Sequence, residues 1–322
     1  MATTSTATAD TPQAPRSLRI YAWIVTIYTI LVIVWGGAVT ATGSGNGCGD
    51  HWPLCDGQVV VSHPQLKMMI EYGHRLSSGL VLFAIFALLV WTWRATRRHH
   101  IARIFSIAAT ILIINEALLG AGLVLLRLTT GGITLERVLY FALHFTNTFL
   151  LLAAVAGTAH FLTRKSGFMR GQVRFRSLGF GLPGLLALLV VAVSGSVAEL
   201  GDMVYPATNL RAAIIADFSS HGSWLIRLRW LHPAFALLAG AFLLWLVFGA
   251  VQKPALRGLG FAVLAVLGLQ YALGITDVLL LAPTWIQLTH LFVADLLWVA
   301  VFLLAVRLCI VETPQPLPYS TH

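Results

Sequence analysis

Eight apolar segments, each about as long as a membrane-crossing helix, are spaced along the chain and separated by more polar connections. A helix needs about 20 mainly apolar residues to cross the hydrocarbon core of a bilayer. The segments lie near residues 20–40, 67–93, 101–126, 135–162, 177–200, 228–251, 256–282 and 285–309. The pattern predicts an all-α integral membrane protein with eight transmembrane helices, whose outer surface is in contact with membrane lipid.

The composition agrees with a membrane location. Apolar residues make up 58% of the chain and charged residues only 10%, whereas soluble domains carry about 25% charged residues. Residues 1–15 are rich in Thr and Ala, and residues 311–322 contain several prolines. We expect both stretches to be tails outside two helical halves, residues 16–165 and residues 166–310.

The positions of Lys and Arg indicate how the helices are oriented, because these residues favour the cytoplasmic side of a membrane. With the N-terminus in the cytoplasm, fourteen Lys and Arg residues fall on the inner side and seven on the outer side. We therefore expect both termini in the cytoplasm. This topology also accounts for the net charge of +9, and we infer no nucleic-acid partner from that charge.

Four histidines lie inside the predicted helices, where an ionisable side chain is costly and usually functional. They are His74, His144, His232 and His290, each near the outer end of an even-numbered helix. Their similar depth allows two facing pairs, His74 with His144 and His232 with His290. Facing imidazoles in a helical bundle are suitable haem ligands. The alternative is that each histidine only forms a hydrogen bond with a neighbouring helix.

The two halves of the chain resemble each other at these histidines. Offsets between 146 and 158 residues align them, and four helices per half give both halves the same orientation in the membrane, as a parallel repeat. The aligned positions are Gly37 with Gly195, His74 with His232, Leu119-Gly120 with Leu273-Gly274, and His144 with His290. We expect two four-helix bundles, each with one histidine pair.

The halves differ beside the first histidine of each pair. The offset that aligns these histidines also aligns Glu71, one helical turn before His74, with Arg229. A carboxylate can move protons or stabilise positive charge, whereas an arginine suits a haem propionate. The difference predicts a reactive pocket in the N-terminal half and a permanent electron-transfer haem in the C-terminal half. An ion pair between Glu71 and Arg75, four residues apart, is an equally simple explanation.

Cys48 and Cys55 lie together in the first outer loop. The outer face of a bacterial plasma membrane is oxidising, which favours a disulfide between them. A metal site is the weaker alternative, because two thiols need further ligands and only His51 and His63 are near.

Four other features leave more than one interpretation open. Glu116, Asp277 and Asp295 are acids inside helices, and we favour a structural role or the support of a ligand histidine for each. The outer segment around residues 201–227 contains an Ala212–Phe218 stretch, which fits either an interfacial helix or a lid over the second pocket.

The motifs together resemble those of the haem A synthases. The stretches Gly36-Gly37-Ala38-Val39, Thr42-Gly43-Ser44-Gly45 and Cys48 through Cys55 look like that family's first helix and loop. Glu71-Tyr72-Gly73-His74-Arg75 looks like its glutamate–histidine–arginine motif. Leu231-His232-Pro233, Leu288-Thr289-His290 and Asp295-Leu296-Leu297-Trp298 resemble its C-terminal ligand segments. The resemblance runs over residues 20–310, and departs from the common pattern at Thr40-Ala41 and at Gly49-Asp50-His51-Trp52.

The resemblance implies a bacterial plasma-membrane enzyme that oxidises the methyl group of haem O to a formyl group, giving haem A for terminal oxidases. It implies that His232 and His290 hold the iron of a haem b and that His74 and His144 hold the substrate haem. Glu71 would be the catalytic residue, and Cys48 and Cys55 would form a loop disulfide. Arg75 and Arg229 are the candidates for contacting propionates or supporting the pockets. The expected partners are haem O synthase (protohaem farnesyltransferase) and an unidentified electron acceptor.

Two other functions are compatible with some of these features. A di-haem b-type cytochrome would transfer electrons between quinone and a partner, but it would not need Glu71 beside one of two unequal pockets. A transporter would need helices broken at the midplane, and the sequence has no paired break.

For the enzyme, two histidine ligands leave no iron position for dioxygen. Water is therefore the expected source of the formyl oxygen.

Overall fold

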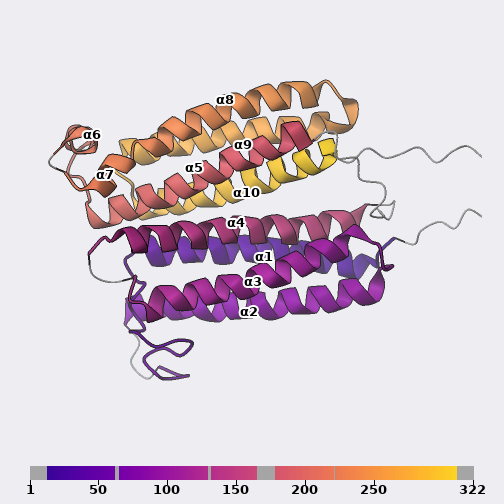
Figure 1. Cartoon of the computed structure of the whole chain (residues 1–322), viewed down its shortest axis with the longest axis horizontal. Helices are drawn as coiled ribbons and strands as arrows, with labels where there is room; N and C mark the ends of the chain where they lie inside the picture. The colour runs from indigo at the N-terminus through magenta and orange to yellow at the C-terminus, as the bar shows by residue number, and fades with distance from the viewer. Residues whose placement is uncertain (1–12, 62–64, 130–131, 165–177, 221, 310–322) are drawn as a thin grey trace, which may run out of the picture.

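The computed structural model describes residues 13–61, 65–129, 132–164, 178–220 and 222–309, and these residues are mainly helical (Figure 1). Eight of their helices are long and apolar enough to cross a membrane, which confirms the predicted number. The helices are α1 (Arg16–Ala41), α2 (Leu66–Ala95), α3 (Ile101–Leu125), α4 (Leu135–Thr163), α5 (Leu178–Val204), α6 (Leu210–Phe218), α7 (Trp224–Leu228), α8 (Leu231–Val251), α9 (Pro254–Leu279) and α10 (Thr284–Cys309).

The long helices form two rings of four. In the N-terminal half, α1 and α3 each contact both α2 and α4, and in the C-terminal half α5 and α9 each contact both α8 and α10. The halves meet through α1 and α4 on one side and α5 and α10 on the other, and they lie as two layers in Figure 1. The described chain begins and ends at the same end of these helices. Which end faces the cytoplasm stays a prediction, as do the exact limits of the two halves.

The contact between the halves is closely packed around α4. Residues 151–162 of α4 are almost all buried, because this helix has neighbours on several sides. Phe149 packs edge to face against Trp298 of α10 at 5.4 Å between ring centroids, and the indole N–H donates to the Phe149 carbonyl at 2.7 Å. This hydrogen bond satisfies a polar group that neither lipid nor core could satisfy.

Helices farther from this contact expose large apolar side chains. On α2, Leu80 and Phe83 are 58% and 69% exposed, and on α8 Leu238 and Phe248 are 70% and 69% exposed. Such surfaces are unfavourable in water and favourable in a lipid bilayer, which agrees with a multi-pass membrane protein.

The helix limits differ from the predicted ones mainly at the outer end of the C-terminal half. There α5 continues to Val204, so it carries Glu199 and Asp202 in its last turns, and the short α7 precedes α8. The Ala212–Phe218 stretch is helical, within α6, although its role stays open. Most of both predicted tails, in residues 1–12 and 310–322, and also His63 lie outside the described residues.

Candidate functional site

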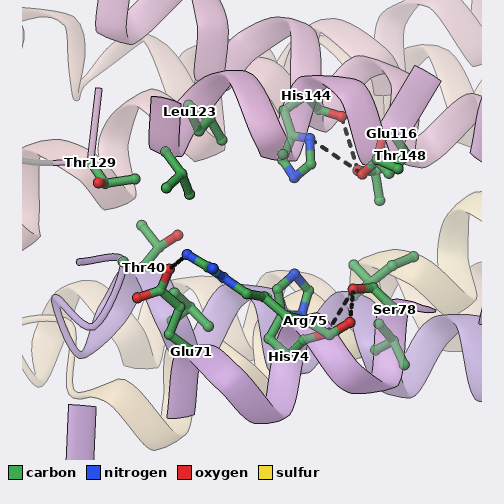
Figure 2. Close-up of a pocket in the computed structure, with 18 of the residues that line it drawn as sticks. Thr40, Glu71, His74, Arg75, Ser78, Glu116, Leu123, Thr129, His144 and Thr148 are labelled. Atoms are coloured by element: carbon green, nitrogen blue, oxygen red, sulfur yellow. Dashed lines mark hydrogen bonds and ion pairs between the residues drawn. The ribbon is translucent and has the colours of Figure 1, made fainter. Parts of the chain in front are cut away.

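A cavity of about 770 Å³ lies inside the N-terminal ring of helices. This volume is in the range of small-molecule and cofactor pockets. His74 on α2 and His144 on α4 line opposite walls, as Figure 2 shows. Glu71 and Glu116 line the same cavity, so the structure brings together four chemically active side chains from three helices.

Glu71 is held firmly at the edge of this cavity. Its side chain is buried and its Oε1 lies 2.5 Å from Nη2 of Arg75, one turn along α2. Its Oε2 accepts the backbone N–H of Cys48 at 2.8 Å. The ion pair proposed as the simple structural explanation is therefore present, and it fixes the carboxylate within the pocket.

The first outer loop closes over the cavity. Cys48 and Cys55 form a disulfide, as predicted, and no group of metal-binding side chains occurs in the described residues to support the alternative metal site. Arg75 donates to the carbonyls of His51 at 2.6 Å and Leu54 at 2.8 Å. The same arginine therefore joins the loop to the Glu71 carboxylate, which could not be foreseen from their separation in the sequence.

Glu116 lies beside His144, on the wall of the cavity opposite His74. Its Oε1 is 3.5 Å from Nδ1 of His144, and its Oε2 accepts the Asn147 amide at 2.5 Å. The Thr148 hydroxyl also lies within hydrogen-bond distance of Oε1. The sequence left the role of this acid open, and the structure gives it two polar partners and one predicted haem ligand.

The second histidine pair lies inside the C-terminal ring. The rings of His232 and His290 are 6.3 Å apart between centroids and nearly perpendicular, at 85°. Nδ1 of His232 is 3.1 Å from the Val191 carbonyl, and Ser194 lies 3.3 Å from the same atom. Nε2 of His290 is 3.2 Å from the Gln270 amide nitrogen. The structure thus brings together the second predicted pair as well.

The predicted support of a ligand histidine by Asp277 or Asp295 does not appear. Asp295 is fully buried, and neither of its carboxyl oxygens has a hydrogen-bond partner in the described part of the chain. Oδ1 of Asp277 is also buried without such a partner. The polar side chain that contacts His290 is Gln270, which lies one helical turn before Gly274 on α9. The sequence did not indicate this residue as part of the site, because its side chain is uncharged.

Arg229 has two carboxylate partners of its own. Its Nη1 lies 2.6 Å from Asp202 and its Nη2 lies 2.7 Å from Asp217, and the guanidinium also donates to the Ala213 carbonyl at 3.3 Å. These bonds tie the end of α5 and the helix α6 to the start of α8. A contact between Arg229 and a haem propionate stays a prediction. The two acids were missed because they lie outside the predicted helices.

Each predicted haem ligand packs against a glycine of a neighbouring helix. A Cβ atom placed on Gly36 would lie 3.0 Å from Cε1 of His74, and one placed on Gly195 would lie 3.0 Å from Cε1 of His232. The other histidine of each pair also lies near a glycine: Gly120 is near His144, and Gly274 is near His290. In the structure the equivalent of Gly195 is therefore Gly36, one residue away from the Gly37 that the sequence offset selected.

These close contacts give a first prediction. Gly195→Ala is expected to push the His232 imidazole from its position, because the added methyl group has no room without movement of the ring. Overpacking of this kind costs roughly 1–3 kcal/mol, and we expect a loss of thermal stability and weaker binding of added haemin by the C-terminal pair. Gly249→Ala on α8 is the matched control, since no heavy atom of another described residue would lie within 4 Å of its Cβ. Equal behaviour of the two variants would contradict the prediction.

The chain is similar to one protein family and to several individual proteins. The family model of the cytochrome oxidase assembly proteins, COX15-CtaA, matches residues 19–302. A protoheme IX farnesyltransferase of Thermus thermophilus is 37% identical over 292 residues, which cover 88% of this chain and 47% of that protein. A heme A synthase of Geobacillus kaustophilus is 26% identical over 74% of this chain and 72% of its own length. One from Alkalihalophilus pseudofirmus is 41% identical over 44% of each chain. The chain spans about half the length of the Thermus relatives it matches.

Proposed function

Because the chain belongs to the COX15-CtaA family of cytochrome oxidase assembly proteins, we propose that it is a haem A synthase. It would oxidise the methyl group of haem O to a formyl group and so provide haem A for terminal oxidases. The N-terminal cavity is the observation that carries this proposal, because two histidines face each other across it and the Glu71 carboxylate lies at its edge. The names of several relatives also support it.

Haem O is the proposed substrate, bound between His74 and His144. The resident cofactor is proposed to be a haem b held by His232 and His290. The pairs are suited to haem because each brings together two imidazoles from different helices. His232 uses Nδ1 toward a carbonyl, which leaves Nε2 for the iron. At His290 the Gln270 amide nitrogen lies 3.2 Å from Nε2, so the Gln270 side chain would have to turn away for Nε2 to bind the iron. When bound, haem b would supply one-electron redox chemistry.

Water is the proposed source of the formyl oxygen. A histidine on each face of the substrate haem leaves no iron position for dioxygen. The methyl carbon would take the oxygen of a water molecule and give up electrons and protons to an acceptor outside the chain. Glu71 is the proposed catalytic residue, since Arg75 and the Cys48 N–H hold its carboxylate where it can accept a proton or stabilise positive charge.

Protohaem farnesyltransferase is the proposed partner that supplies the substrate. The Thermus relative carries that enzyme's name and matches this chain over about half its length, so a single protein there combines a segment like this chain with a further segment. A neighbouring enzyme could pass its lipid-soluble product directly to this cavity.

The proposed location is a bacterial plasma membrane, with both termini in the cytoplasm and the histidines near the outer face.

The function is tested by the haems of a host that makes haem O, extracted with and without this chain. We expect a formyl-bearing haem only when the chain is present, and oxygen-18 in its formyl group when the cells grow in labelled water. Label that comes only from dioxygen would overturn the proposed oxygen source. Unchanged haem O beside bound haem b would instead indicate an electron-transferring di-haem cytochrome.

A further inference from the structure

We propose that Glu116 is a positioning residue for the substrate haem. Its carboxyl group would accept the Nδ1–H of His144 and so direct the Nε2 of that imidazole into the cavity. This inference rests on the proposed function, because it concerns the histidine that would hold haem O.

The geometry around Nδ1 of His144 points to this role. The atom is buried, and it forms no shorter hydrogen bond with the described residues, while Oε1 of Glu116 lies 3.5 Å away. Figure 2 shows the His144 ring projecting into the cavity, with Glu116 beside it on the same wall. A metal-binding histidine usually donates its second ring N–H to a carboxylate, a carbonyl or a water. Glu116 is such an acceptor, and a small rotation of either side chain would close the hydrogen bond.

A short network fixes the carboxyl group in this orientation. Asn115 donates to the Asn147 side chain at 2.8 Å, and the Asn147 amide in turn donates to Oε2 of Glu116 at 2.5 Å and to the Leu112 carbonyl at 2.9 Å. These donors come from α3 and α4. The acid is therefore held as an acceptor whose Oε1 faces the histidine.

The C-terminal half lacks this arrangement. The offset of 154 residues that aligns Gly120 with Gly274 places Gln270 at the position of Glu116, and Val293 and Ala294 replace the donors Asn147 and Thr148 in the matching helix. In that half the Nδ1 of His232 faces the Val191 carbonyl, a neutral acceptor. A carboxyl group behind a ligand histidine thus occurs only in the half that also carries Glu71, within the residues described.

The difference has a chemical consequence for the substrate. A carboxylate hydrogen-bonded to a coordinated imidazole makes that imidazole a stronger donor to the metal, and a stronger donor favours ferric over ferrous iron. Glu116 would therefore hold the substrate haem more tightly and lower its midpoint potential. Nδ1 of His74 is buried without a hydrogen-bond partner among the described residues, so His74 lacks a comparable carboxylate acceptor there.

Glu116→Gln tests the role with a side chain of nearly the same size and shape, whose amide oxygen can still accept the hydrogen bond from Asn147. The full chain would be purified with its haem, and haemin would be titrated into the N-terminal pocket. We expect the affinity for haemin to fall by roughly 10- to 100-fold. We also expect the midpoint potential of this haem to rise, by about 59 mV if the ferric form is weakened tenfold more than the ferrous form. The signals of the C-terminal haem should not change.

Glu136→Gln is the matched control, since it makes the same chemical change at an exposed position on α4. Glu116→Asp should recover part of the affinity and potential if a carboxyl acceptor is what matters. An unchanged titration and potential in Glu116→Gln would overturn the inference, as would an equal change at both haems. Failure of the unaltered chain to bind haemin in the N-terminal pocket would instead reject the proposed function itself.

Discussion

Replacing Glu71 by glutamine is expected to stop the oxidation of haem O while the C-terminal haem remains bound. Loss of a positioned acid–base group typically lowers a rate by about 10²- to 10⁴-fold, and the amide would lack the negative charge that Glu71 places at the edge of the proposed substrate cavity. The measurement is the amount of formyl-bearing haem formed per protein by the purified full chain or by expressing cells.

The ion pair with Arg75 makes a second explanation testable in the same variant. If Glu71 only anchors Arg75 and the loop it holds, the loss of activity should be accompanied by lower thermal stability and easier proteolysis of that loop. Glu136→Gln, exposed on α4, should behave like the unaltered protein. Full formation of formyl haem by Glu71→Gln would eliminate this residue as the catalytic group.

Removing either imidazole of the C-terminal pair is expected to abolish tight binding of haem b. His232→Ala and His290→Ala would each remove one of the two proposed haem ligands. The haem b absorbance of the purified protein should therefore disappear, or change to that of a pentacoordinate haem. His74→Ala and His144→Ala should keep this absorbance and lose the binding of added haem in the N-terminal pocket.

His99→Ala is the control for these four variants, because His99 is exposed beyond the end of α2. Its haem content should match that of the unaltered chain. Retention of the haem b spectrum in both His232→Ala and His290→Ala would show that the haem is held elsewhere, and the assignment of the C-terminal pair would then be wrong.

The number of helices and the positions of the four histidines could be predicted from the sequence because both depend on simple constraints. An apolar stretch long enough to cross the bilayer must be helical, and an imidazole within it is conspicuous. The depth of each histidine then follows from its distance to the helix end. For this reason His74 and His144 could be paired without any knowledge of the packing.

The polar partners could not be predicted for an equally physical reason. Lipid and protein interior are both apolar, so α9 and α10 are hydrophobic on all sides and their sequences do not indicate which face is buried. The contact between Gln270 and His290 depends on how each helix is rotated about its axis, and it could therefore not be predicted from the sequence. Arg75 was noticed beside Glu71, but its bonds to His51 and Leu54 depend on how the loop folds back.

In each histidine pair, one histidine lies on a helix at the contact between the halves, and the other lies on a helix away from that contact. α4 and α10, which carry His144 and His290, belong to the packed contact between the halves, whereas α2 and α8, which carry His74 and His232, have their main contacts within their own half. Leu76 and Leu80, on the turns that follow His74, are each 58% exposed. α2 and α8 are therefore the helices that a lipid-soluble molecule would meet first if it approached a histidine pair from the bilayer. A shift of α2 would leave the contact between the halves, which α1, α4, α5 and α10 form, in place.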